Sequence, residues 1–318
     1  MNFYTFYKKY GIYCVLLAII VFFSIASSSF LSGDNLINIL RQVSMFGIVV
    51  VGVSMVIISG GSDLSVGGQM AVDGMLAATM IVTLKLPIWI AVLATMALGI
   101  VFGFINAYLN IRFGIFPMIV TLGTMLILNG AAYLVSGGYA IFGLPESFKF
   151  LGQGHVGIIP VPVIVFLIVV VIGMIILNKT YFGRDIYAMG GNPEASHLAG
   201  IRIDRIRMYT YMICGFLTSI AALIMLSRTN SAQPSAGSSY PFDCMTAACL
   251  GGVSVAGGEG NVAGAIAGVL IIGILNNGLS LMNCDSNLIG CIKGAVLLVA
   301  VGIDCAQKLP KKAKVQKA

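Results

Sequence analysis

The stretch VGIIPVPVIVFLIVVVIGMIILN, residues 156–178, contains no charged side chain. About 20 apolar residues in a helix cross the hydrocarbon core of a bilayer, so this stretch is long enough to span a membrane. Further uncharged runs of similar length recur along the chain. They lie at 10–33, 42–62, 86–111, 113–145, 208–227 and 260–284.

The composition supports the same conclusion. Of 318 residues, 58% are hydrophobic and only 9% are charged, which is far too apolar for an ordinary soluble protein. We therefore predict an all-α, polytopic membrane bundle that forms a single domain over residues 1–318. The helix at 243–256 is too short to span comfortably, which favours a half-helix packed inside the protein. Ten helices are expected, at about 11–31, 41–59, 65–84, 87–111, 117–136, 160–178, 207–227, 243–256, 262–282 and 288–305.

The positions of Lys and Arg predict the orientation, because positive residues near helix ends stay in the cytoplasm. Both termini and the loop 179–206 are therefore predicted to be cytoplasmic. The net charge of +7 then reflects topology, and no nucleic-acid partner is expected. The basic tail 306–318 is expected to face lipid headgroups. The supporting cations are Lys8, Lys9, Lys179, Arg184, Arg202, Arg205, Lys308, Lys311, Lys312, Lys314 and Lys317, and the discordant ones are Arg41, Lys149 and Arg228.

No catalytic, cofactor or metal motif is visible. The sequence has no phosphate-binding loop, no HExxH and no paired carboxylates, so any ATP hydrolysis must come from a partner. The seven cysteines form no CxxC pair and are interpreted as small apolar side chains. The N-terminal pattern of two lysines, an apolar run and SIASSS fits either an uncleaved first helix or a signal peptide.

Polar residues concentrate in SGGSDLSVGG, residues 59–68. Two interpretations remain open: a turn in which Asp63 or Ser65 caps the next helix, or a broken segment that lines a substrate path. Asp73 lies within the following helix, where a lone carboxylate is expected to face the protein interior or water. A second glycine-rich stretch, GGVSVAGGEGNVAGAIAG at 251–268, contains the small-residue spacing that permits close helix packing, and Glu259 is expected in a turn.

Several amides fall within apolar helices. Each can hydrogen-bond a neighbouring helix, or it can meet the hydroxyl groups of a neutral polar solute. These amides are Asn106, Asn110, Asn129, Asn276 and Asn277.

The stretch GGNPEASHLAG, residues 190–200, predicts a short helix. Asn192 suits the N-cap, Pro193 the first helical position, Glu194 the first turn, and Gly200 the residue after the end. A helix shorter than about 12 residues is marginal alone in water. It therefore either docks on a cytoplasmic protein, which we favour, or lies on the membrane surface, although it lacks a wide apolar face rimmed by Lys and Arg.

Four stretches in order resemble the permeases of ribose, xylose and autoinducer-2 importers, the second carbohydrate uptake group of the ATP-binding-cassette (ABC) superfamily. They are SGGSDLSVGG at 59–68, GRDIYAMGGNPEASHLAGI at 183–201, CLGGVSVAGGEGNVAGAIAGVLIIGILNNGL at 249–279 and IKGAVLLVAVGID at 292–304. The chain departs from the resemblance at Ser62 and Asp73, where apolar residues are expected.

The resemblance implies a dimer of permeases, identical or paralogous, around a central sugar path. It also implies a cytoplasmic ABC ATPase and an extracytoplasmic sugar-binding protein, with the ATPase contacting the loop 183–201. The implied ATPase-coupling residues are Gly190, Asn192, Glu194, Ala195 and Gly200.

The candidate path residues are Asp63, Ser65, Asp73, Asn106, Asn276 and Asn277. The main alternative is an ion-coupled secondary transporter, which is expected to carry a defined pair of charged residues in the membrane. Asp63, Asp73, Asp243 and Lys293 look dispersed in the sequence, which disfavours that alternative. An intramembrane enzyme is a further alternative, disfavoured by the absence of catalytic groups.

Overall fold

The computed structural model describes residues 3–308, with side chains described from Ile12 to Gly302 and at Cys305. Residues 309–318 of the predicted basic tail lie outside this range, as do the side chains of Lys8 and Lys9. The described chain is almost entirely helical. The helices are α1 Phe3–Ala26, α2 Gly33–Ile58, α3 Val66–Ala78 with a π-helical turn η1 at Thr79–Thr83, α4 Ile88–Phe113, α5 Pro117–Ser136, α6 Glu146–Gln153, α7 Val161–Lys179, α8 Tyr181–Gly191, α9 Pro193–Leu198, α10 Ile203–Thr229, α11 Tyr240–Leu250, α12 Val262–Leu281 and α13 Ser286–Lys308.

All the predicted membrane helices are present. Within the described residues, α2, α3 with η1, α4, α5, α7, α10 and α12 are long and apolar enough to cross a membrane. Helices α1 and α13 contribute the shorter apolar stretches Ile12–Ala26 and Ser286–Gly302, and α11 is a half-helix. The prediction of a polytopic helical membrane protein is confirmed.

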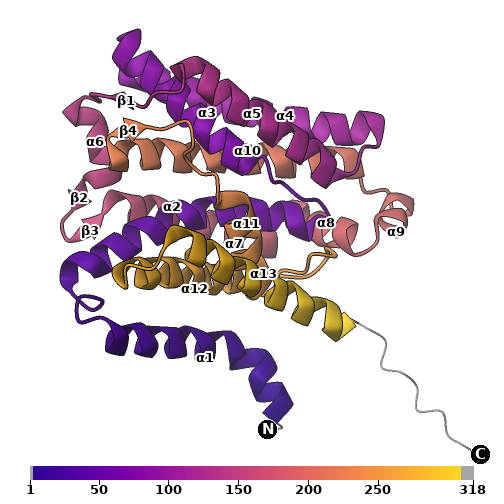
Figure 1. The fold of residues 1–318 in the computed structure, drawn as a ribbon. Helices are drawn as coiled ribbons and strands as arrows, with labels where there is room; N and C mark the ends of the chain where they lie inside the picture. The colour runs from indigo at the N-terminus through magenta and orange to yellow at the C-terminus, as the bar shows by residue number, and fades with distance from the viewer. Residues whose placement is uncertain (1–2, 309–318) are drawn as a thin grey trace, which may run out of the picture.

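Helices α2 and α10 form the centre of the bundle. In α2, every residue from Val43 to Ile58 is buried, and α10 packs against α2, α3 and α4. The apolar stretch of α2 is 89% buried, whereas that of α4 is 22% buried, so α4 presents most of its apolar surface outward. Such a surface is stable in contact with lipid. Figure 1 shows α6, β2 and β3 at one end of the bundle and α8 and α9 at the other, which we call the α6 end and the α9 end.

Two short antiparallel strand pairs lie at the α6 end (Figure 1). β1 (Ile141–Phe142) pairs with β4 (Ser231–Ala232), and β2 (His155–Val156) pairs with β3 (Ile159–Pro160). The β1–β4 pair ties the segment before α6 to the segment between α10 and α11.

The three cations that disagreed with the predicted orientation also gather at the α6 end, and each has a partner. Arg41 donates from Nη2 to the Gln153 carbonyl oxygen at 3.0 Å, and Arg228 donates from Nη2 to Asn38 Oδ1 at 2.7 Å. Lys149 forms an ion pair with Glu146. These contacts explain how positive side chains are held at the end of the bundle opposite the loop 179–206.

Some predicted boundaries were wrong. Helix α2 begins at Gly33 rather than at about 41, because Ser32 caps it by accepting from the Asn35 N–H and Asp34 lies in its first turn. Helices α6 and α8 were not predicted, since both are short and carry charged residues.

The eighth predicted helix, 243–256, is instead α11, Tyr240–Leu250. It ends before a run of glycines that includes Gly252 at φ +80° and Gly257 at φ +84°, a backbone conformation that favours glycine. The non-helical segment 251–261 follows. The predicted close helix packing is confirmed for Gly264 and Gly268 of α12, where a Cβ would lie within 2.1 Å of the Gly251 and Ala247 carbonyl oxygens respectively.

Candidate functional site

Helix α9 forms as the sequence predicted. Asn192 Oδ1 accepts a hydrogen bond of 2.9 Å from the Ala195 N–H, Pro193 opens the helix, and Glu194 lies in the first turn. Gly200 at φ +85° ends it, and its N–H donates to the His197 carbonyl oxygen at 2.9 Å. In α9 itself only Ser196 is buried, so this helix presents almost its whole surface outward.

Helix α8 joins α9 to the membrane bundle. It is amphipathic: Ile186 and Met189 are fully buried, while Tyr181 is 81% exposed. Thr180 caps it by accepting from the Gly183 N–H at 3.1 Å and also donates to the Ile176 carbonyl oxygen of α7 at 2.6 Å. These contacts fix α8 to the end of α7, so α8 and α9 are firmly attached to the bundle.

Four glycines bring three distant parts of the chain together at the α9 end. We call Gly60, Gly190, Gly257 and Gly258 the glycine junction. The Gly258 N–H donates to the carbonyl oxygen of Ile58, the last residue of α2, at 2.8 Å. A Cβ on Gly190 would lie 1.8 Å from that same oxygen and 2.6 Å from the Gly258 nitrogen, so the backbones meet without room for a side chain.

The junction connects the three glycine-rich stretches that the sequence showed separately, at 59–68, 183–201 and 251–268. Tyr187 of α8 strengthens the connection, because its hydroxyl donates to the Gly260 carbonyl oxygen at 2.8 Å. Burial raises the pKa of Tyr187, so the phenol keeps the proton that this hydrogen bond requires. Any displacement of α8 therefore acts directly on the ends of α2 and of the segment 251–261.

The segment 59–65 is a buried turn. Asp63 Oδ1 accepts from the Ser65 N–H at 2.9 Å and from Ser65 Oγ at 2.6 Å, and Asn106 Nδ2 donates to Ser65 Oγ at 2.8 Å. Tyr211 of α10 donates to the Ser62 carbonyl oxygen at 2.9 Å. Burial raises the pKa of Asp63, and the hydrogen bonds from Ser65 oppose that rise. The structure thus brings together three of the predicted residues, Asp63, Ser65 and Asn106, as contacts between the turn and α4.

Asp73 lies apart from these residues, fully buried between α3 and α10. Its Oδ2 accepts from Ser219 Oγ at 2.6 Å and from Gln69 Nε2 at 3.1 Å, while Oδ1 has no hydrogen-bond partner. Gln69 also donates to the Gly215 carbonyl oxygen at 2.6 Å. Gln69 is four residues before Asp73 and therefore on the same helical face, which is the one local signal of this cluster; it was not predicted.

The adjacent amides Asn276 and Asn277 have different surroundings at the α6 end. Asn277 exchanges two hydrogen bonds with Asn35 of α2, at 2.9 and 3.0 Å, and so joins α12 to α2. Asn276 instead faces a cavity, and its Oδ1 has no partner. Asn110 accepts from Arg207 at 3.0 Å and donates to the Ile115 carbonyl oxygen, so it also holds helices together.

The cavity beside Asn276 has a volume of about 190 Å³ and lies among α2, α10, α11, α12 and α13. We call it the polar cavity. Asp243 of α11 and Lys293 of α13 form an ion pair across 2.8 Å in its wall. The expectation that these two charges are dispersed was wrong, because the fold brings together residues that are 50 positions apart. The polar lining residues are Gln42, Arg228, Ser239, Asp243, Asn276 and Lys293.

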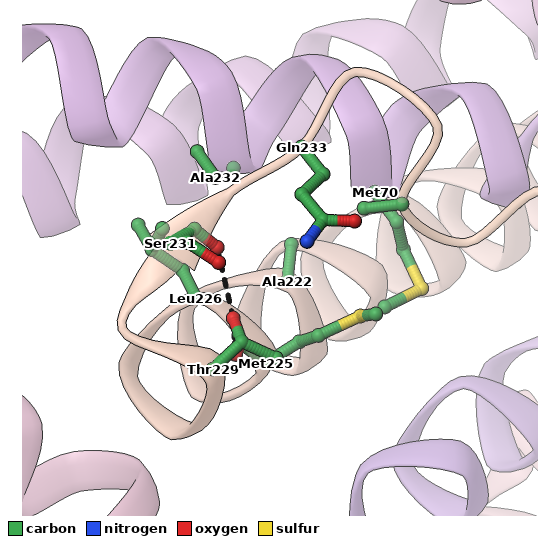
Figure 2. A pocket seen from close by; sticks show the side chains of 10 residues that line it. Met70, Ala222, Met225, Leu226, Thr229, Ser231, Ala232 and Gln233 are labelled. Atoms are coloured by element: carbon green, nitrogen blue, oxygen red, sulfur yellow. Dashed lines mark hydrogen bonds between the residues drawn. The ribbon is translucent and has the colours of Figure 1, made fainter. Parts of the chain in front are cut away.

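A smaller cavity of about 60 Å³ lies between α3, α10 and the segment that contains β4. Figure 2 shows Met70, Met225 and Gln233 around it, with Thr229 donating to the Ser231 carbonyl oxygen at 2.8 Å. Met225 lines both cavities, so only this flexible side chain and its neighbours separate them. The part of the chain that the structure describes contains no group of three or more His, Cys, Asp or Glu side chains that could hold a metal ion.

Comparison with known proteins covers almost the whole chain. The family model described as "Branched-chain amino acid transport system / permease component" matches residues 35–301. The chain is 40% identical to the ribose import permease protein RbsC of Bacillus subtilis (strain 168), over 93% of this chain and 92% of that protein.

Other relatives are similar over comparable lengths. The RbsC protein of Escherichia coli (strain K12) is 39% identical over 91% of each chain. The galactose/methyl galactoside import permease protein MglC of Haemophilus influenzae (strain ATCC 51907 / DSM 11121 / KW20 / Rd) is 35% identical over 96% of each chain. No solved structure matches. The family match and the extent of these identities together show that the chain belongs to the family of permease components of branched-chain amino acid transport systems.

Proposed function

We propose that the chain is the membrane permease subunit of an ABC importer that carries a monosaccharide or a related neutral polyol. The observation that carries this proposal is the 40% identity to a ribose import permease over 93% of the chain. The galactose permease relatives support the same class of substrate. The matching family is described as the permease component of a transport system, which fits a subunit that works with partners and argues against a self-contained ion-coupled transporter, even though the structure contains a buried ion pair.

In this proposal the exposed helix α9 docks on a cytoplasmic ABC ATPase. A helix of six residues cannot be stable alone, and Asn192, Ala195 and Gly200 fix both of its ends. Glu194 is exposed and so available to a partner. Gly190 connects this helix to the rest of the protein through the glycine junction. ATP-driven movement of the ATPase then reaches α2 and the segment 251–261 through backbone contacts.

The proposed orientation places the α9 end and both termini in the cytoplasm of a bacterial cell, in its inner membrane. The cations of the loop 179–206 support this placement, since such residues remain cytoplasmic. The α6 end then faces outward, toward an extracytoplasmic sugar-binding protein. A second permease chain, identical or paralogous, completes the path.

Uptake by proteoliposomes tests the proposal. Vesicles that contain this permease with its partner ATPase and sugar-binding protein should accumulate labelled ribose or galactose when ATP is enclosed with the ATPase. Accumulation should stop when ATP is depleted and continue when a proton uncoupler is added. Uptake that survives ATP depletion and stops with the uncoupler would instead support an ion-coupled transporter.

A further inference from the structure

We infer that the polar cavity is a binding site for one monosaccharide on its way through the permease. This inference rests on the proposed function and adds to it a place and a set of residues. Of the six path residues predicted from the sequence, only Asn276 is included. Asp63, Ser65, Asp73, Asn106 and Asn277 are hydrogen bonded to other parts of the protomer and hold its helices together.

The lining of the cavity matches the chemistry of a polyol. A sugar hydroxyl both donates and accepts hydrogen bonds, so it needs acceptors and donors on the same wall. Asn276 lines the cavity, and its side-chain amide carries both donors and an acceptor. Lys293 and Arg228 are donors, while Gln42 offers both functions. These groups come from four different helices and converge on one space.

The cavity wall contains one compensated ion pair and one further cation. The Asp243 carboxylate and the Lys293 ammonium compensate each other across 2.8 Å, while Arg228 donates to the neutral amide of Asn38 at 2.7 Å and keeps its positive charge. A neutral sugar can hydrogen-bond these groups without separating the ion pair. Phe46 and Tyr240 pack edge to face beside them, with ring centroids 5.7 Å apart, and add an apolar wall of the kind that covers the carbon face of a sugar ring.

The size of the cavity also fits. Roughly 10–15 Å³ of such volume holds one water molecule, so about 190 Å³ holds on the order of a dozen water-sized atoms. A monosaccharide has a similar number of non-hydrogen atoms. The cavity is therefore large enough for one sugar ring.

The half-helix α11 explains why a site forms here. Irregular backbone at membrane depth is tolerated only where it is buried in protein or lines a cavity. The segment before α11 is irregular, and Ser239, Tyr240 and Asp243 at the start of α11 line the cavity. The far end of α11 leads into the segment 251–261, which carries two members of the glycine junction. Movement at the α9 end is thus connected through α11 to the wall of the cavity.

The test is sugar import by the complete importer in proteoliposomes, with ribose and galactose as probes. Asn276→Leu and Gln42→Leu remove one polar group each from two different helices, α12 and α2. The loss of one hydrogen bond in a buried site is expected to weaken sugar binding by about tenfold. Each variant should therefore import less sugar for the same ATP hydrolysis, so the ATP consumed per sugar imported rises by about tenfold. Asn276→Gln retains the amide and is expected to restore import. Asn129→Leu is the matched control, because Asn129 is half-buried on α5 and outside the cavity.

The outcomes separate the two proposals. If the unaltered importer takes up neither sugar with ATP, the proposed function fails. The second outcome is that the unaltered importer takes up sugar but Asn276→Leu and Gln42→Leu consume the same ATP per sugar as Asn129→Leu. In that case the proposed function stands and the binding site is refuted. A rise confined to the two cavity variants, reversed by Asn276→Gln, supports the site.

Discussion

Replacing Gly190 by alanine tests the glycine junction directly. Gly190 is packed so closely that an added Cβ would lie 1.8 Å from the Ile58 carbonyl oxygen and 2.6 Å from the Gly258 nitrogen. Both atoms belong to the backbone and cannot rotate away as a side chain can. Ordinary contacts begin at about 3.4 Å, so the two backbones must separate by about 1.6 Å. The neighbouring residue offers a matched control, since a Cβ on Gly191 would meet nothing within 4 Å.

The size of the effect follows from these distances. Overpacking costs about 1–3 kcal/mol. The added Cβ also crowds both atoms of the 2.8 Å hydrogen bond from the Gly258 N–H to the Ile58 carbonyl oxygen, and loss of that bond would add about 0.5–1.5 kcal/mol. With that bond lost, the total of about 1.5–4.5 kcal/mol lowers the population of the intact junction by roughly 10- to 2,000-fold. We therefore expect Gly190→Ala to reduce ATP-driven uptake by at least about tenfold, while Gly191→Ala retains it.

The assay is uptake of labelled sugar by proteoliposomes that contain the complete importer, with ATP hydrolysis measured in parallel. In the proposed function the junction transmits movement and does not bind ATP, so the importer with Gly190→Ala should keep hydrolysing ATP while importing little sugar. Thermal unfolding of the purified permease separates this uncoupling from a general loss of fold. Equal uptake by Gly190→Ala and Gly191→Ala would show that the junction transmits nothing.

Two further predictions concern α9 and the buried ion pair. Ala195→Pro removes the N–H group that donates to Asn192 Oδ1 at 2.9 Å, so uptake should be lost while the sugar affinity of the binding protein stays unchanged. Ala195→Ser keeps that N–H group and should transport normally. Normal transport by both variants would rule out a role for the α9 cap. Lys293→Met leaves the buried Asp243 carboxylate unpaired and should lower the free energy of unfolding by about 3–5 kcal/mol. The double variant Asp243→Leu with Lys293→Met should regain most of that lost free energy. Thermal unfolding measures both changes. Equal destabilisation by the single and double variants would mean that the pair is not coupled.

The sequence predicted those parts of the fold that depend on neighbouring residues. Long apolar runs identified the membrane helices, because lipid requires every backbone group to be paired within the segment. Asn192, Pro193 and Gly200 identified α9, since caps act within a few residues of a helix end. Both kinds of signal are local.

The remaining features depend on contacts between distant residues. Helix α8 is stabilised by the burial of Ile186 and Met189 against other helices, and the spacing of these two residues is too short a pattern to predict a helix in a charged segment. Each glycine-rich stretch was visible, but their meeting at Gly190 depends on how α2, α8 and α11 pack. The pairing of Asp243 with Lys293 likewise follows from the packing of α11 on α13, so the polar cavity was not predictable.

The docking of α9 on the ATPase can be measured by site-specific photo-crosslinking in the assembled importer. Leu198 of α9 is 87% exposed and is the natural position for a photoreactive side chain. Leu84, which is 60% exposed and follows η1 near β1 at the α6 end, provides the control. We predict a crosslink from position 198 to the ATPase and none from position 84. An intact, ATP-hydrolysing complex in which position 198 crosslinks only to lipid, or not at all, would contradict the proposed coupling.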